Sequence, residues 1–164
     1  MGISMHIPAP HPPHEDLRNE VASQSWLFSA VSDRSLASLA KKARLVFRTR
    51  WSGVCLIVED SQHVVASSGG MLGIYRRSTA ISSYVVAFPD VPFVVLNALE
   101  DERFAGNPFV EDRMIGFYVG AALHVDGYAV GALCVTDPEP RVGVDAAQLA
   151  ELESLARQIE LMRP

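Results

Sequence analysis

The chain has 164 residues, a length typical of one domain with a sizeable hydrophobic core. Its formal net charge of −5 and the lack of an offsetting Lys/Arg run argue against a nucleic-acid partner. No apolar stretch approaches the roughly 18 residues of a membrane span, and no signal-peptide pattern opens the chain. We therefore expect a cytoplasmic protein that binds neither nucleic acid nor a membrane.

The first residues of the chain carry four prolines, at positions 8, 10, 12 and 13, and no hydrophobic periodicity. This composition predicts a flexible N-terminal arm over residues 1–14, followed by a single domain over residues 15–164. Three histidines (His6, His11 and His14) fall in this arm. Without acidic or thiolate neighbours, they indicate an unstructured tail more than a metal site.

Three helices are predicted, two of them flanking the domain. Apolar residues recur at helical spacing over residues 15–31 and again over 145–162, where Asp145 is the expected N-cap. Between residues 33 and 47, Asp33 is expected to cap a helix with one apolar stripe and Lys41, Lys42 and Arg44 on its opposite face. The last helix has near-heptad spacing, which leaves open whether it packs on the domain's own sheet or on a second copy.

The middle of the chain predicts short strands and loops. Residues 51–58 and 63–67 are expected to form two strands, and the Gly-rich residues 68–77 a loop. A short helix capped by Ser78 or Thr79 should cover residues 80–87, followed by a strand at 93–96. A helical turn over 97–104 would then precede a break at Asn107-Pro108.

The strongest local signal is a β-hairpin centred on Asp126-Gly127. Apolar runs at residues 115–125 and 128–135 flank this dipeptide, which suits a type I′ turn because that turn needs positive φ at both central residues. Small residues such as Gly116, Gly120 and Gly131 interrupt both runs. They leave room for a helix or a ligand to approach the sheet closely.

The segment from Phe93 to Arg141 resembles the GAF domain family, in the branch found in bacterial sensor kinases and diguanylate-cyclase-like proteins. The motifs that carry the likeness are FAGNPFV (104–110), GFYVGAAL (116–123), Asp126-Gly127 and GALCVTDPEPR (131–141). The resemblance implies an α+β fold: a central antiparallel sheet of five to six strands, with helices on one face and pocket loops on the other. It also implies a sensory domain that is normally a homodimer through the flanking helices.

The family's pocket loops correspond here to residues 69–88 and 98–114. From them and from the hairpin we expect seven ligand-binding residues: Tyr75, Arg76, Ser83, Tyr84, Asp101, Phe117 and Tyr118. Relatives often carry Ser-Phe-Cys where this chain has Ser82-Ser83, and often an Asp where it has Asn97. The sequence identifies no cofactor or ligand, and the pattern of cyclic-nucleotide-binding members is not recognisable.

Three functions remain open from the sequence. The first is a regulatory GAF domain, not an enzyme, that binds a small molecule or a signalling protein. The second is a degenerate GAF module that only dimerises or interacts with partners. The third is a free methionine-R-sulfoxide reductase, which needs loop cysteines, whereas Cys55 and Cys134 fall in apolar strands typical of unreactive buried thiols. His63 and His124 are expected to be half-exposed strand residues, not haem or metal ligands.

Overall fold

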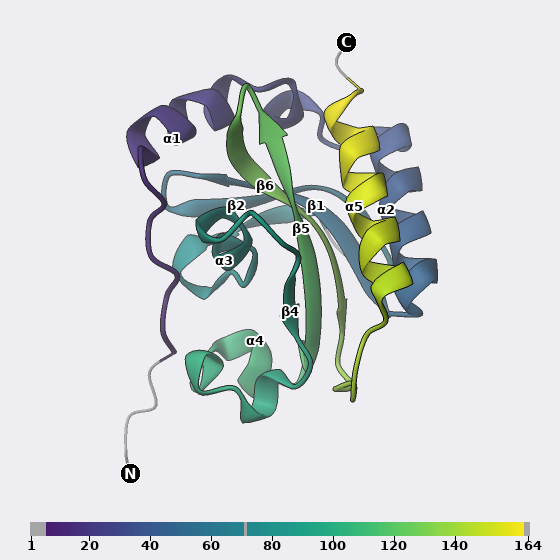
Figure 1. The fold of residues 1–164 in the computed structure, drawn as a ribbon. Helices are drawn as coiled ribbons and strands as arrows, with labels where there is room; N and C mark the ends of the chain where they lie inside the picture. Colours follow the sequence, from purple (N-terminus) through teal and green to yellow (C-terminus); the bar gives the residue numbers. More distant parts are fainter. Residues whose placement is uncertain (1–5, 71, 163–164) are drawn as a thin grey trace.

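A single antiparallel sheet forms the centre of the molecule in the computed structural model, which describes residues 6–70 and 72–162. Its six strands are ordered β3-β2-β1-β6-β5-β4, and every neighbouring pair runs antiparallel (Figure 1). Their bounds are β1 Trp51–Val58, β2 Ser61–Ser68, β3 Gly73–Arg76, β4 Phe93–Val95, β5 Phe117–Val125 and β6 Tyr128–Asp137. The predicted α+β class is confirmed.

The hairpin of β5 and β6 turns at Asp126-Gly127, as predicted. Asp126 has φ 50° and Gly127 has φ 82°, the positive values that a type I′ turn requires. Val125 and Tyr128 face each other across the turn, and the pairing continues to Phe117 opposite Asp137. The hairpin is therefore the longest pairing in the sheet and joins β1 to the β4 edge.

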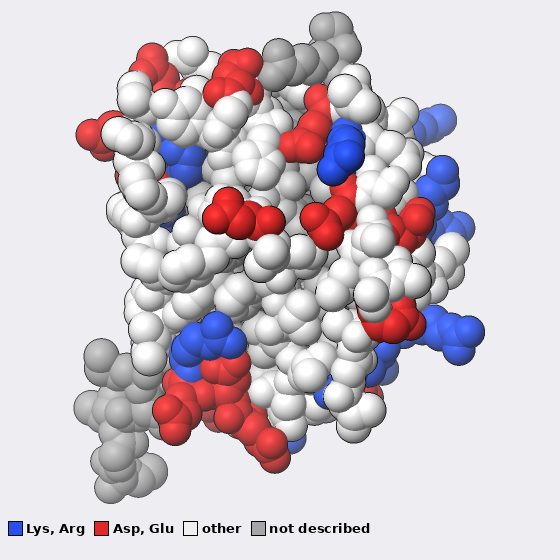
Figure 2. Space-filling view, in the orientation of Figure 1, with Lys and Arg blue, Asp and Glu red and all other residues white. Residues whose placement is uncertain are grey.

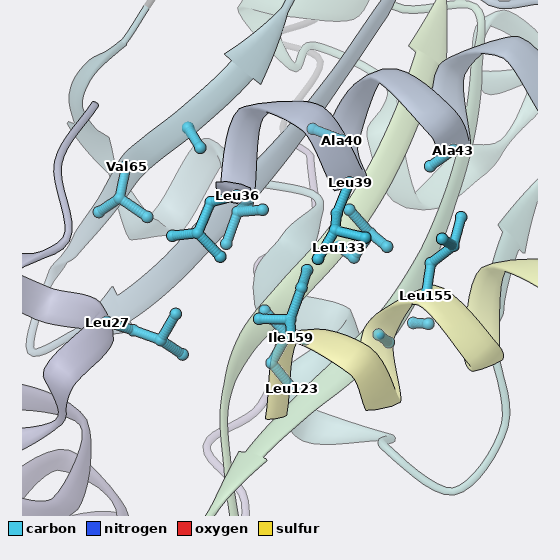
Figure 3. Packing of buried hydrophobic residues seen from close by; sticks show 14 of the residues in the cluster. Leu27, Leu36, Leu39, Ala40, Ala43, Val65, Leu123, Leu133, Leu155 and Ile159 are labelled. Carbon is cyan, nitrogen blue, oxygen red and sulfur yellow. The ribbon is translucent and has the colours of Figure 1, made fainter. Parts of the chain in front are cut away.

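Helices α2 (Arg34–Phe47) and α5 (Ala146–Glu160) cover one face of the sheet side by side (Figure 1). Both predicted caps are present: the Asp33 carboxylate accepts from the backbone N–H of Ser35 and Leu36, and Asp145 forms a capping box with Gln148. Figure 3 shows leucines and isoleucine from the two helices meeting the sheet residues between them. The labelled residues are Leu27, Leu36, Leu39, Ala40, Ala43, Val65, Leu123, Leu133, Leu155 and Ile159.

Helix α1 (Glu15–Gln24) crosses the end of the sheet and is shorter than predicted. The prediction extended it to residue 31, but Ser25 adopts an extended backbone and its hydroxyl donates to the carbonyl of Ala22. A 3-10 turn (Trp26–Ser29) follows. A side-chain bond to the backbone thus ends the helix where hydrophobic periodicity continues.

The opposite face carries α3 (Ser82–Ala87), α4 (Pro108–Glu111) and 3-10 turns at Arg77–Thr79, Ala98–Glu100 and Glu102–Phe104. Three predictions here were wrong. Residues 73–76 form strand β3 instead of a loop, α3 begins without a side-chain cap, and Asn107-Pro108 starts a helix instead of a break. The last has a simple cause, because Pro suits the first helical position and the Asn107 side chain accepts from the Phe109 N–H.

The N-terminal segment, residues 6–13, lies across this second face, although a flexible arm was predicted. The Ile7 N–H donates to the carbonyl of Arg103 at 2.7 Å, and the Ile7 carbonyl accepts from the hydroxyl of Tyr84. His6 Nε2 lies 2.7 Å from the carbonyl oxygen of Ser78. These contacts are made by backbone groups, so composition gave no sign of them. Residues 1–5 lie outside the described part, and the domain boundary at residue 15 stays a prediction.

The outer edge of β5 is only partly paired. Strand β4 covers Tyr118 to Gly120, and further along the strand the backbone N–H of His124 donates to the Glu160 carboxylate of α5 at 2.6 Å. None of the helices in residues 6–70 and 72–162 is long and apolar enough to cross a membrane.

Candidate binding site

The space between the sheet and the helices of the second face is filled by aromatic side chains. Tyr84 of α3 stacks on Phe93 with ring centroids 5.2 Å apart and meets Phe104 edge-on at 5.4 Å. Phe93 in turn contacts Tyr118 of β5 at 6.4 Å. We call Tyr84, Phe93, Phe104 and Tyr118 the aromatic cluster. It belongs to a second hydrophobic core, separate from the one beneath α2 and α5.

Arg103 closes the outer side of the aromatic cluster. Its guanidinium lies 5.0 Å from the ring centroid of Phe93 and 5.3 Å from that of Phe104, within cation–π range. The same guanidinium forms a 2.6 Å ion pair with Asp101. The hydrogen bond from Arg103 lowers the pKa of the Asp101 carboxyl, against the opposing effect of its partial burial. Asp101 therefore has a structural partner within the chain.

Four polar side chains are buried where α3 meets the sheet. The hydroxyls of Ser82 and Tyr118 lie 2.7 Å apart, and the sulfurs of Cys55 and Cys134 lie 3.9 Å apart on neighbouring strands. The hydrogen bond with Cys134, together with burial, raises the pKa of the Cys55 thiol. Burial likewise raises the pKa of Tyr118. This arrangement keeps Cys55 and Tyr118 protonated at neutral pH.

A groove opens beside the aromatic cluster, under the N-terminal segment. Its volume is about 400 Å3. We call it the arm groove. The N-terminal segment contributes Pro8, Ala9 and His11 to its wall. The remaining lining residues carry charges or hydroxyls, and are Asp60, Arg76, Arg77, Ser78 and Ser83.

Arg77 of the arm groove belongs to a buried ionic network. Its Nη1 donates to the Glu15 carboxylate at 2.5 Å and to the carbonyl of Glu59 at 3.0 Å. Arg18 binds the same carboxylate at 2.7 and 3.0 Å, so that one carboxylate serves two buried guanidiniums. Burial opposes ionisation of Glu15, but the hydrogen bonds from Arg18 and Arg77 prevail and lower its pKa from 4.5 to about 2.

One atom of this network lacks a partner. The Nη2 nitrogen of Arg77 is buried and makes no hydrogen bond to any described residue. Arg18, by contrast, uses its remaining nitrogen on the carbonyls of Ile57 and Ala129. A buried guanidinium nitrogen without an acceptor is unfavourable, and Arg77 reaches the arm groove.

The structure divides the predicted ligand-binding residues into separate places. Arg76 and Ser83 line the arm groove, whereas Tyr84 and Tyr118 belong to the aromatic cluster and Asp101 borders it through Arg103. Tyr75 of β3 packs against Phe109 with ring centroids 6.0 Å apart.

Phe117 lies on the opposite face of the sheet, in the core under α2 and α5, so its predicted place in the pocket was wrong. Side chains alternate along a strand, and the prediction placed neighbours 117 and 118 on the same face. Sequence reasoning also missed Arg77, Glu15 and the N-terminal segment. An acid in the first turn of α1 indicated only a favourable helix dipole, because its partner is 62 residues away.

Metal ligation has no basis in the described part of the chain, where no three His, Cys, Asp or Glu side chains are grouped as a metal site needs. His63 lies against Phe28 with ring centroids 5.1 Å apart, and His124 Nδ1 lies 3.1 Å from the Glu160 carboxylate. Both imidazoles thus have partners of another kind.

The fold and sequence match proteins of known class. A cyclic di-GMP phosphodiesterase of Pseudomonas aeruginosa is 30% identical over 152 residues, which are 92% of this chain and 26% of that protein. The chain thus spans about a quarter of that relative's length.

Among solved structures, the GAF domain of an Acinetobacter phosphoenolpyruvate-protein phosphotransferase superposes with a TM-score of 0.64 at 19% identity, over 88% of this chain and 86% of that one. A free methionine-R-sulfoxide reductase of Neisseria meningitidis superposes with a TM-score of 0.60 at 18% identity, over 97% and 94%. At such identities these two show the fold alone. The sequence pattern of the GAF domain family, however, matches residues 28–162. The chain belongs to the GAF domain family, whose members are sensory and signalling domains.

Proposed function

We propose that this chain is a non-catalytic regulatory domain that binds a small polar ligand in the arm groove and dimerises through α2 and α5. The observation that carries the proposal is the arm groove itself, with a volume of about 400 Å3. Ligand sites usually measure about 300–1,000 Å3 and combine apolar walls with a few polar groups. The arm groove has this composition, with Pro8 and Ala9 beside arginine and serine side chains.

A reductase function has less support, despite the similarity in fold to an enzyme. A reactive thiol needs partial exposure and a nearby cation that favours the thiolate. Cys55 and Cys134 are only 3% and 7% exposed, and a tyrosine and a serine hydroxyl are their polar neighbours. The raised pKa of Cys55 further disfavours a nucleophilic role.

A second candidate is a GAF module that only interacts with other proteins. The aromatic cluster favours it, because side chains fill the space between the sheet and α3. The partner in either case would be a signalling enzyme. The similarity to a quarter of a cyclic di-GMP phosphodiesterase supports an enzyme of that kind.

Dimerisation through the helical face has support from charge. Lys41 and Lys42 are exposed on α2, while Glu151 and Glu153 are exposed on α5. Figure 2 shows basic side chains along the margin where α2 lies and acidic ones over α5. A two-fold axis that places α2 of one copy against α5 of the other would pair these charges twice. Leu45, 58% exposed on α2, supplies apolar area at the same surface.

Native mass spectrometry of the purified chain tests both parts of the proposal. We expect a mass of two chains plus a small ligand that is released on denaturation. A monomeric mass at high concentration would overturn dimerisation, and a ligand-free chain that binds nothing from a metabolite library would leave the interaction module as the function.

A charge swap locates the dimer surface. Lys41→Glu with Lys42→Glu should weaken the dimer, and adding Glu151→Lys with Glu153→Lys should restore it, as measured by sedimentation equilibrium. The swapped α5 pair tested alone is the matched control. If both sets of variants stay fully dimeric, the interface lies elsewhere.

A further inference from the structure

We infer that the arm groove binds a small oxyanion, a carboxylate or phosphate group, through the guanidinium of Arg77. The inference rests on the proposed function, because it specifies the chemistry of the ligand that the groove takes. It starts from two facts established above: two buried guanidiniums share one carboxylate, and one of their nitrogens has no acceptor.

The charge of the network is unbalanced. Arg18 and Arg77 are 2% and 6% exposed, so neither charge is solvated by bulk water. Glu15 neutralises one of them, and the other contacts of the two guanidiniums are to neutral carbonyl groups. An uncompensated buried charge is costly, and a bound anion removes that cost. The anion would take Nη2 of Arg77, which has no other partner among the described residues.

The surroundings of Arg77 narrow the class of ligand. Arg76, exposed on β3, lines the arm groove and offers a second guanidinium to the same group. Asp60 also lines the groove, and its carboxylate would repel a second negative charge. Pro8 and Ala9 provide apolar contact. A ligand with one anionic head and a neutral or cationic remainder fits this set.

The N-terminal segment controls access to the site. Nη2 of Arg77 is buried, so an anion reaches it only when part of the groove wall moves. Pro8, Ala9 and His11 form a wall that comes from a separate stretch of chain. Two hydrogen bonds at Ile7, to Arg103 and Tyr84, hold that stretch in place. Segments of this kind, with few contacts, open more easily than a packed core.

Arginine side-chain and backbone NMR spectra of the whole chain test the inference. Sodium phosphate and sodium acetate are titrated separately at constant ionic strength, to distinguish the two kinds of oxyanion. We expect a saturable shift of the Arg77 guanidinium signals with at least one of them. Arg77→Lys keeps the charge but loses the fork of donors, so the dissociation constant should rise about tenfold. Arg76→Gln should raise it severalfold.

Two further variants give the test its direction. Glu15→Gln removes the only carboxylate bonded to the two guanidiniums, so it should tighten anion binding and make phosphate or acetate raise the Tm more than in the unmodified chain. Arg34→Gln is the control, because Arg34 is an exposed arginine on α2 that does not line the groove. It should bind the anion as the unmodified chain does.

Several outcomes would overturn the inference. One is the absence of saturation up to about 100 mM of either anion, roughly a hundredfold above a millimolar dissociation constant. Another is equal weakening by Arg34→Gln and Arg76→Gln, which would indicate general charge attraction. If Arg77→Lys does not fold, Arg76→Gln and Glu15→Gln decide, since the inference requires opposite changes in affinity. A co-purified ligand without an anionic group would contradict this inference and leave the proposed function in place.

Discussion

The carboxylate of Glu15 lies 2.5 Å from the guanidinium of Arg77, across 62 positions of sequence. The bond ties the start of α1 to the 3-10 turn that leads into α3, and the same carboxylate holds Arg18. The first helix and the groove face are therefore joined by one side chain.

Replacement of Glu15 by Gln should destabilise the fold. The change leaves two buried guanidiniums without a counter-charge, and a cost of about 2–3 kcal/mol is expected, below the 3–5 kcal/mol of a fully buried pair. Urea unfolding at pH 7 measures it. Glu20→Gln on the exposed side of α1 is the matched control, expected to lie within about 0.5 kcal/mol of the parent. Equal values for the two variants would contradict a structural role for Glu15.

Stability should fall in acid because of the same carboxylate. Folding lowers the pKa of Glu15 from 4.5 to about 2, so the folded state favours the ionised form. The resulting stabilisation is fully present above about pH 4.5 and is lost as the pH falls toward 2. The hydrogen bond from Arg103 lowers the pKa of Asp101, which adds a loss of the same sign.

Urea unfolding at a series of pH values between 7 and 2 measures this dependence. The Glu15→Gln variant should show a shallower decline than the parent chain, because it lacks the titrating group. Parallel curves for the two proteins would show that other carboxylates account for the acid sensitivity.

The buried hydroxyls of Ser82 and Tyr118 should be energetically coupled. Either Ser82→Ala or Tyr118→Phe leaves the other hydroxyl buried without its 2.7 Å partner, at an expected cost of about 1–3 kcal/mol. The double variant removes both polar groups and should cost less than the sum of the single ones. A double-mutant cycle from thermal unfolding measures the difference, and strict additivity would show that the two hydroxyls act independently.

Gly131 should not tolerate a side chain. A Cβ at this position would lie 1.8 Å from the carbonyl oxygen of Cys55, inside the pairing of β1 with β6. Gly131→Ala should therefore destabilise the chain by about 3 kcal/mol or prevent folding. Gly143→Ala, where nothing lies within 4 Å, is the matched control and should be neutral. Soluble, equally stable protein from both variants would place β1 and β6 further apart than described.

Local signals in the sequence predicted much of the fold. The Asp126-Gly127 turn and the caps at Asp33 and Asp145 depend on residues close together in the chain, and all three are present. The apolar stripe of α2 likewise predicted the face that it buries. Each of these features is decided within about one turn of structure, which a pattern can capture.

The candidate site depends on contacts between distant segments, and there the sequence was a poorer guide. Strand β3 forms in a Gly-rich stretch because β2 supplies its hydrogen bonds, and residue 7 is held by backbone groups of residues 84 and 103. Arg77 and Glu15 acquire their roles only through the fold. Hydrophobic periodicity carries no information on such pairs, so the neighbouring Arg76 was predicted and Arg77 was not.

The contact of Glu160 with the β5 edge has a consequence for how copies of the molecule associate. An uncovered strand edge is a template for the addition of a strand from another chain, which leads to aggregation. Strand β4 ends before His124, and the Glu160 carboxylate takes the backbone N–H that an incoming strand would need. A negative charge at the tip of α5 thus keeps this edge of the sheet from growing into a fibre.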